Sequence, residues 1–355
     1  MKPLIVIAGP TATGKSDTAL AVSEVLEAEI VSADSMQVYK RMDIGTAKPS
    51  SADLARIKHH MIDVVEPDFP FNAAIFNDMA KKAINEIQGK GKTPILTGGT
   101  GFYINALLYG NEFTANECTC SEPPRPKGRG IGLAPAAKPR GIKPVHSAAF
   151  AKCESASASP FCSLLRENKE KKFYREELYK QSPERLFAKL LKIDPEYAET
   201  THMNNVKRVA RALEYYQETG EKFSTYNKRS RENRAGQYNF KLIILTRERG
   251  KLYAGINSRV DRMVSSGLIE EVEFLLTSGV SESATSMQGL GYKEICAYLN
   301  GKVTLKEAID MIKQGTRRFA KRQVTWFKNQ SEGTWLDVDS FISLESIARE
   351  IVSLR

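Results

Sequence analysis

The chain opens with Leu4-Ile5-Val6-Ile7-Ala8, followed directly by Gly9-Pro10-Thr11-Ala12-Thr13-Gly14-Lys15-Ser16. An apolar run that feeds a G-x-x-x-x-G-K-S segment is typical of a buried strand leading into a phosphate-binding loop. In such a loop the glycines let backbone N–H groups approach phosphate oxygens, Lys15 supplies a mobile positive charge, and Ser16 is the expected ligand of Mg²⁺. Residues 15–28 continue with helical apolar spacing, so the context that the motif needs is present.

The first strand-like run sets the pattern for the rest of the chain, in which short apolar runs alternate with helical segments. Strands are expected at 4–8, 29–32, 94–97, 241–246 and near 335–337, and helices at 15–28, 73–88 and 101–109. This alternation predicts an α/β fold of the P-loop NTPase type, a parallel sheet covered by helices. The phosphate-binding loop should lie at the carboxyl ends of the strands, where ligands bind in such folds.

Residues 117–168 interrupt this pattern with a basic segment rich in Pro, Gly and Ser, for which we expect disorder. Between Pro123 and Cys153 there are seven basic residues and no acidic one, so the segment carries much of the formal net charge of +10. It is either an arm that attracts RNA or a passenger insert without a role, and we favour the second interpretation.

Short amphipathic helices are expected at 169–179, 183–192 and 204–216, forming a small helical unit. Long helical patterns follow at 249–278, interrupted at Gly267, and at 304–327. A chain of 355 residues has room for about two domains. We place a helical insertion domain at 116–200 and the two parts of the core at 1–115 and 201–355.

Composition narrows the class of protein further. The five cysteines lack the spacing of a metal site, and the four histidines form no plausible metal set, which favours a reducing compartment and no zinc site. No apolar run approaches membrane-spanning length, and the N-terminus enters a core strand almost at once. We therefore expect a cytoplasmic protein without a membrane partner.

The residues beyond the loop carry a resemblance to a known family. The sequence resembles the tRNA dimethylallyltransferases, also called tRNA isopentenyltransferases, over nearly the whole chain apart from 117–168. Besides the loop, the matching motifs are Asp34-Ser35-Met36-Gln37-Val38-Tyr39, Asp43-Ile44-Gly45-Thr46-Ala47-Lys48-Pro49, Gly98-Gly99-Thr100, Asn205-Val206-Lys207-Arg208-Val209-Ala210-Arg211-Ala212-Leu213-Glu214, Gly291-Tyr292-Lys293-Glu294 and Lys321-Arg322-Gln323-Val324-Thr325-Trp326-Phe327.

The resemblance implies transfer of a dimethylallyl group from dimethylallyl diphosphate to N6 of the adenosine 3′ to the anticodon of tRNA. The loop would then hold the diphosphate leaving group, with Lys15 and Mg²⁺ on Ser16 neutralising its charge. Asp34 would orient the adenine amine and accept its proton; the alternatives are a carboxylate near the magnesium ion or a helix cap. Thr100 would touch the reacting centre or the adenosine sugar, or else cap the helix 101–109.

Arg259 matches a family arginine that points at the diphosphate, a role that suits a guanidinium; the alternative is a solvated position with an Arg–Asp pair. Gly255 departs from the family pattern, because relatives carry another arginine four residues before Arg259. A second cationic contact is therefore missing, and the helix is weakened locally by about 1 kcal/mol.

The resemblance also implies where the anticodon stem-loop of tRNA binds. A monomer is enough for this mechanism, and we expect one. Asp34, Ser35, Met36, Gln37 and Thr100 would meet the flipped-out target base and its neighbours. Arg175 and a run on one helix would contact the RNA further out; the run is Lys207, Arg208, Val209, Ala210 and Arg211. For the cations of that run, the alternative is an ordinary basic surface.

Two other classes of protein compete with this interpretation. One is a P-loop kinase that passes a phosphoryl group from ATP to a small molecule, which would not need Asp34–Tyr39 together with Gly98-Gly99-Thr100. The other is an RNA-binding module without catalysis, against which an intact phosphate loop argues, because binding by phosphate contacts needs only a positive surface.

Overall fold

The computed structural model describes residues 2–110, 174, 177–232 and 237–354. Contacts between Cα atoms divide the chain into two compact units: a core of Met1–Ser121 with Arg234–Arg355, and a helical unit of Glu122–Asn233. The basic segment 117–168, Arg175 and four of the five cysteines lie outside the described residues, and so does most of the helix expected at 169–179.

The core contains one sheet of six parallel strands in the order β3-β2-β4-β1-β5-β6. Its strands are β1 (Leu4–Ala8), β2 (Ala28–Ser32), β3 (His59–His60), β4 (Thr93–Gly98), β5 (Phe240–Thr246) and β6 (Thr334–Asp337). This confirms the predicted α/β fold with a parallel sheet. The strand β3 was not predicted, because two residues are too few to show an apolar pattern.

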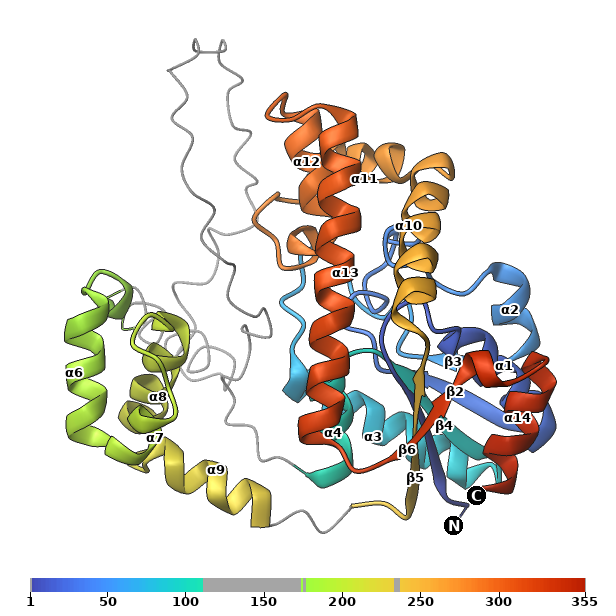
Figure 1. The fold of residues 1–355 in the computed structure, drawn as a ribbon, viewed down its shortest axis with the longest axis horizontal. Coiled ribbons are helices and arrows are strands. Elements are labelled where there is room, and N and C mark those ends of the chain that lie inside the picture. Colours follow the sequence, from blue (N-terminus) through green and yellow to red (C-terminus); the bar gives the residue numbers. More distant parts are fainter. Residues whose placement is uncertain (1, 111–173, 175–176, 233–236, 355) are drawn as a thin grey trace, which may run out of the picture. The chain divides into compact units, whose positions relative to one another are not determined.

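Helices cover both faces of the sheet (Figure 1). Along β1, Leu4, Val6 and Ala8 face a cluster that includes residues of α3 (Ala73–Gly89) and α4 (Gly101–Tyr109). The alternate residues Ile5 and Ile7 face a second cluster with α1 (Lys15–Leu26) and α14 (Leu344–Ser353). Because successive side chains of a strand point to opposite faces, β1 is buried on both sides and reads as a continuous apolar run.

Beyond the carboxyl ends of the strands rise α10 (Arg249–Ser265), α11 (Leu268–Thr277), α12 (Tyr292–Leu299) and α13 (Leu305–Gln330) (Figure 1). The break between α10 and α11 is at Gly267, with φ of 101°, which confirms the interruption predicted there. The helix α13 begins with a capping box between Thr304 and Glu307 and contacts both α10 and α12. The remaining short elements of the core are α2 (Ser51–Arg56), η1 (Ser286–Gln288) and η2 (Val338–Ser340).

The helical unit contains α6 (Pro183–Ile193), α7 (Pro195–Glu199), α8 (Val206–Thr219) and α9 (Phe223–Glu232). Its apolar core joins α6 to α8, so residues 201–232 group with the helical unit, whereas the sequence-based boundaries assign them to the core. Asp194 is buried and accepts hydrogen bonds from the backbone N–H of Tyr197 (3.1 Å) and of Ser224 (2.7 Å). One carboxylate thus fixes the start of α7 to α9.

Two segments of the core that flank the helical unit in the sequence meet near the end of α4. The backbone N–H of Gln237 donates to the carbonyl of Leu108 at 2.8 Å, next to the end of α4. Within the described part of the chain, no helix has the length and apolar character needed to cross a membrane.

Candidate active site

The phosphate-binding loop lies at the carboxyl end of β1, where Gly14 caps the first turn of α1. Its shape depends on glycine at two positions: Gly14 has φ of 80°, and a Cβ at Gly9 would lie 2.5 Å from the carbonyl oxygen of Leu245. The carbonyl of Pro10 accepts from the Thr13 hydroxyl (2.9 Å) and from Lys15 Nζ (2.7 Å). The first N–H groups of a helix have no partner within the helix, so the start of α1 at this loop is suited to an anion.

Helix α10 packs directly against this loop. Leu252 and Ile256 form a small apolar cluster with Ala320 of α13, and Ala12 of the loop packs on it. A Cβ at Gly255 would lie 3.8 Å from the Cβ of Ala12, so the helix passes close to the loop there. Arg259 follows one turn later, on the same face as Gly255.

The charged groups predicted to act together do lie within electrostatic reach of one another. Burial lowers the pKa of Lys15 from 10.5 to about 7, helped by the positive charge of Arg259 and opposed by Asp34. The pKa of Arg259 is also lowered, mainly by burial, and Asp34 opposes this too. Arg259 is half-buried, and the nearby Asp261 pairs with Lys313 instead, its carboxylate lying 2.5 Å from Lys313 Nζ. The site therefore brings Lys15 and Arg259 close to the carboxylate of Asp34, and Asp17 and Arg262 also act on Arg259 electrostatically.

The lowered pKa of Lys15 predicts that binding of an anion in the loop is coupled to uptake of a proton from solution. A bound diphosphate favours the ammonium form, so Lys15 should take up a proton when the anion binds above pH 7. Uptake should approach about one proton near pH 8.5 and vanish near pH 6. Calorimetry with inorganic pyrophosphate in buffers of different ionisation enthalpy measures this. The difference between the wild type and Lys15→Met isolates the lysine, and an equal uptake by both proteins would contradict the prediction.

Asp34 lies just beyond β2 and forms a tight turn with the residues that follow. Its Oδ1 accepts from the N–H of Met36 (2.8 Å) and of Gln37 (3.4 Å), so the carboxylate stabilises this turn and caps no helix. Asp34, Ser35 and Met36 are half-buried. The Gln37 side chain is buried and bonded to Ser32 (2.9 Å) and to the carbonyl of Ala47 (3.2 Å), which gives it a structural role in the loop.

Thr100 lies beside this turn, at the end of β4. Its N–H donates to the carbonyl of Ala33 at 3.4 Å, and a Cβ at Gly98 would lie 2.2 Å from that same carbonyl. Thr100 occupies the N-cap of α4, but its hydroxyl makes no capping hydrogen bond. The capping alternative is therefore not what the structure shows, and the backbone of Thr100 is held next to Asp34 through Ala33.

Three site residues escaped the sequence-based assignment of roles. Gln323 of α13 accepts from the N–H of Thr11 (2.9 Å) and donates to the carbonyl of Gly99 (2.8 Å). Glu271 accepts from three successive N–H groups of the Asp43–Gly45 turn, at 2.7, 2.7 and 3.0 Å. The hydroxyl of Tyr292 donates to Glu271 at 2.7 Å, while burial raises the pKa of this phenol. Tyr292 and Gln323 stand in motifs that resemble the family and Glu271 stands in none of them, but for all three no local pattern told which atoms they would meet.

The residues expected to bind RNA on the helical unit differ in exposure. Lys207 and Arg208 are exposed on α8, and Arg211 is half-buried. Val209 and Ala210 are fully buried in the apolar core of the unit, so their side chains are not available to RNA. Alternation of this kind follows from the helical period, because successive residues point 100° apart.

Replacing Gly255 with alanine should stabilise the core by about 0.5 to 1 kcal/mol, because Gly255 lies inside a helix and a Cβ there makes only ordinary contacts. Urea unfolding of the full chain measures the change. Gly315→Ala in α13 is the matched control, since its Cβ would lie 2.8 Å from Leu290 Cδ2 and no gain is expected. An equal increase in the free energy of unfolding for both variants would show that the space around the added Cβ does not determine the gain.

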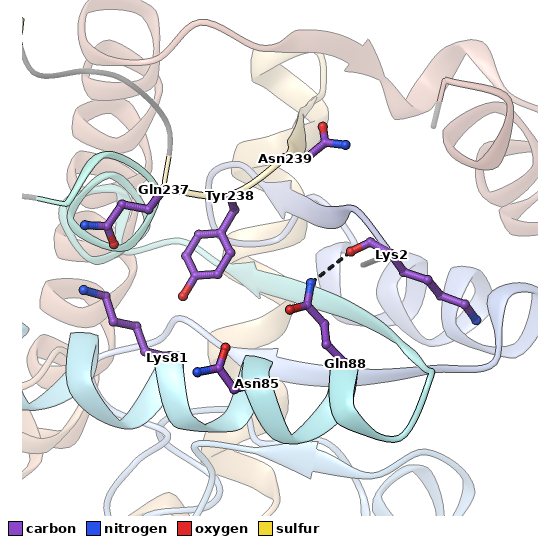
Figure 2. A pocket seen from close by; sticks show the side chains of 7 residues that line it. All are labelled: Lys2, Lys81, Asn85, Gln88, Gln237, Tyr238 and Asn239. Atoms are coloured by element: carbon purple, nitrogen blue, oxygen red, sulfur yellow. Dashed lines mark hydrogen bonds between the residues drawn. The ribbon is translucent and has the colours of Figure 1, made fainter.

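A hollow of about 700 Å³ opens at the end of the sheet opposite the phosphate-binding loop (Figure 2). Tyr238 points toward α3, from which Lys81, Asn85 and Gln88 project, and Gln88 donates to the carbonyl of Lys2 at 2.9 Å. The hollow contains none of the predicted site residues and lies at the amino-terminal edge of the strands. It is therefore separate from the candidate active site.

Another group with possible ligand atoms lies at the start of β2. Ligand atoms of Glu29, His60 and Glu86 are within 4.8 Å of one another. Burial alone would raise the pKa of Glu29, but hydrogen bonds from His60 and Lys92 bring it down to about 2. Because Lys90 and Lys92 hold this carboxylate at 3.4 and 3.0 Å, the group is an ion-pair cluster in which a metal ion would meet two ammonium groups.

The sequence model of the family described as IPP transferase matches residues 37–130 and 151–330. The chain belongs to the IPP transferase family. The unmatched stretch within the match, 131–150, is narrower than the segment 117–168 that composition sets apart.

Relatives of this IPP transferase are similar over almost their whole length. The tRNA dimethylallyltransferase of Acetivibrio thermocellus is 42% identical over 351 residues, covering 99% of this chain and 96% of the relative. The tRNA dimethylallyltransferase of Pelotomaculum thermopropionicum is 41% identical over 350 residues, covering 99% and 95%. Among solved structures, the tRNA delta(2)-isopentenylpyrophosphate transferase of Staphylococcus epidermidis superposes with a TM-score of 0.64 at 35% identity, covering 100% of this chain and 99% of the other.

Proposed function

We propose that this protein transfers a dimethylallyl group from dimethylallyl diphosphate to N6 of the adenosine 3′-adjacent to the anticodon of tRNA, releasing diphosphate. The observation that carries the proposal is the convergence of Lys15, Arg259 and Asp34 at one phosphate-binding loop. The names of the full-length relatives support the same activity. All three groups belong to one chain, so we propose that it acts as a monomer. The relatives are named for an activity on tRNA, and we propose that this chain meets its tRNA in the cytoplasm.

The leaving group is the part of the reaction that the loop serves. As the C–O bond breaks, negative charge grows on the diphosphate and the allylic carbon becomes cation-like. In this proposal Lys15 and Arg259 neutralise that charge, together with the N–H groups at the start of α1, and their mutual electrostatic influence supports it. Positive groups held in place before the reaction stabilise the transition state more than mobile water does.

The acceptor is a poor nucleophile, because the lone pair of an exocyclic adenine amine is delocalised into the ring. Asp34 can accept a hydrogen bond from this amine and take its proton as the new C–N bond forms. Its Oδ1 is already engaged with the backbone of Met36, which orients the carboxylate. The hydroxyl of Thr100 would hold the adenosine beside it.

Mg²⁺ is the ion we propose for this site. Ser16 is exposed at the start of α1, next to Lys15, and would provide a hydroxyl oxygen, a type of donor that a hard cation prefers. A bound magnesium ion would contribute charge neutralisation on the diphosphate. The ion-pair cluster at Glu29 lies at the opposite end of the strand and does not serve this purpose.

The decisive test compares two labelled donors. The purified chain is incubated with an anticodon stem-loop and either labelled dimethylallyl diphosphate or ATP labelled on its terminal phosphate. We expect the prenyl label to move to adenosine, with a mass increase of one dimethylallyl group, and no label to move from ATP. Phosphoryl transfer without prenyl transfer would favour a kinase, and RNA binding without either would favour a binding module.

Replacing Lys207 and Arg208 with alanine should weaken tRNA binding and reduce its dependence on salt. Each phosphate neutralised by a cation contributes about 0.7 to 0.9 to the slope of log K against log salt, so the slope should fall by about 1 to 2. Filter binding at several salt concentrations measures this, and affinity for pyrophosphate should not change.

The matched control replaces Lys189 and Lys192, two exposed lysines of α6, with alanine. It removes the same charge from the same unit. If both double variants lower the slope equally, the effect is general electrostatics and α8 is not a specific contact.

A further inference from the structure

Gln323 is a polar residue on the buried stripe of α13. Ala320 and Phe327, three residues before it and four after it, are both fully buried, and Gln323 itself is only 6% exposed. A carboxamide buried at such a position costs free energy unless both of its ends are hydrogen-bonded. Here both ends are bonded, to two different loops.

The two loops leave neighbouring strands. Ala8 of β1 lies opposite Gly98 of β4, so the phosphate-binding loop and the Gly99–Thr100 turn begin side by side. Gln323 Oε1 accepts from the N–H of Thr11 at 2.9 Å, and its Nε2 donates to the carbonyl of Gly99 at 2.8 Å. The carboxamide therefore spans the gap between the loops and satisfies one backbone group on each.

Gly99 leaves room for this bridge. A Cβ at Gly99 would lie 2.3 Å from Gln323 Nε2, while its next nearest neighbour, the carbonyl oxygen of Gly9, would be at an ordinary 3.5 Å. The φ of Gly99 is not in the left-handed region, so the backbone itself would accept alanine. The requirement for glycine here comes from the carboxamide.

We propose that Gln323 is a positioning residue, whose carboxamide sets the spacing between the phosphate-binding loop and the Gly99–Thr100 turn. This rests on the proposed function, in which the first loop holds the leaving group and the turn faces the acceptor. A change of about 1 Å in such a spacing can lower a rate about a hundredfold.

The main test is Gln323→Met, which keeps the length of the side chain and removes both hydrogen bonds. We expect a 10- to 100-fold lower single-turnover rate at saturating donor, weaker binding of inorganic pyrophosphate, and tRNA affinity within about twofold of the wild type. The matched control is Gln314→Met, the same change at an exposed position of α13, where none of these quantities should move. A lower melting temperature with wild-type rate and pyrophosphate affinity would overturn the proposal.

A double-mutant cycle tests the bridge without relying on one variant. Gly99→Ala should displace the carboxamide and weaken pyrophosphate binding in the wild type. In the Gln323→Ala background the space is free, so the same change should have little further effect. Additive effects of the two substitutions would show that Gly99 and Gln323 act separately.

The two proposals can fail independently. If the wild type transfers no prenyl group, the proposed function fails, but pyrophosphate affinity in the cycle still measures the bridge. If transfer is normal and the cycle is additive, only the role of Gln323 fails.

Discussion

Replacing Lys15 with alanine should abolish prenyl transfer while leaving the protein folded. The lysine acts on charge that grows on the diphosphate, and removal of one such group lowers a rate by about two to three powers of ten or more. Folding should not suffer, because the fold lowers the pKa of Lys15 to about 7 and so disfavours its charged form. Single-turnover transfer with excess enzyme measures the chemical step.

Lys15→Arg is the informative companion, because it keeps the positive charge but changes its shape and reach. We expect it to recover part of the pyrophosphate affinity and less of the rate. Circular dichroism and the melting temperature should match the wild type for both variants. Near-normal transfer by Lys15→Ala would mean that the loop does not hold the diphosphate.

Replacing Asp34 with asparagine should lower the chemical step by about two to four powers of ten, the range expected for a positioned base. Asparagine keeps an oxygen for the N–H of Met36, so the turn should persist, but it cannot accept the proton of the amine. Affinity for pyrophosphate should stay the same or improve, because a negative charge near Lys15 and Arg259 has been removed. Single-turnover rates and pyrophosphate titrations separate these two effects.

Asp17→Asn is the control for charge alone. Asp17 also influences Arg259 electrostatically, but it lies on α1 and is exposed. A small effect there beside a large one at Asp34 supports the role of a base. Equal losses of single-turnover rate at both positions would mean that Asp34 acts only through its negative charge and not as a base.

The phosphate-binding loop could be predicted because each of its requirements is local. The strand before it is apolar at every position, the glycines occupy the tight positions, and the helix follows at once. The break at Gly267 was equally visible, since a glycine in the left-handed conformation ends one helix and caps the next. Signals of this kind need no knowledge of distant residues.

The long-range hydrogen bonds that hold the loops of the site in place could not be predicted in the same way. Glu271 and Gln323 act on backbone atoms that are 224 to 312 positions away in the sequence, and helical spacing gives no information on what lies opposite. One clue was present for Gln323, an amide on an otherwise apolar stripe of α13. The burial of side chains on α8 was also missed: the run 207–211 contains three basic residues, but Val209 and Ala210 within it lie in the apolar core of the helical unit.

The bridge between Thr11 and Gln323 also bears on the order in which the protein is made. The loop leaves the ribosome before its partner, which follows 312 positions later in the chain. The apolar face of α1 is covered by α14, which comes later still. Contacts so far apart along a chain form late and slowly. A nascent chain therefore carries the phosphate-binding motif without the contacts that Gln323 and α14 make. A truncated product that ends before α13 should be unable to bind prenyl diphosphate in the cell.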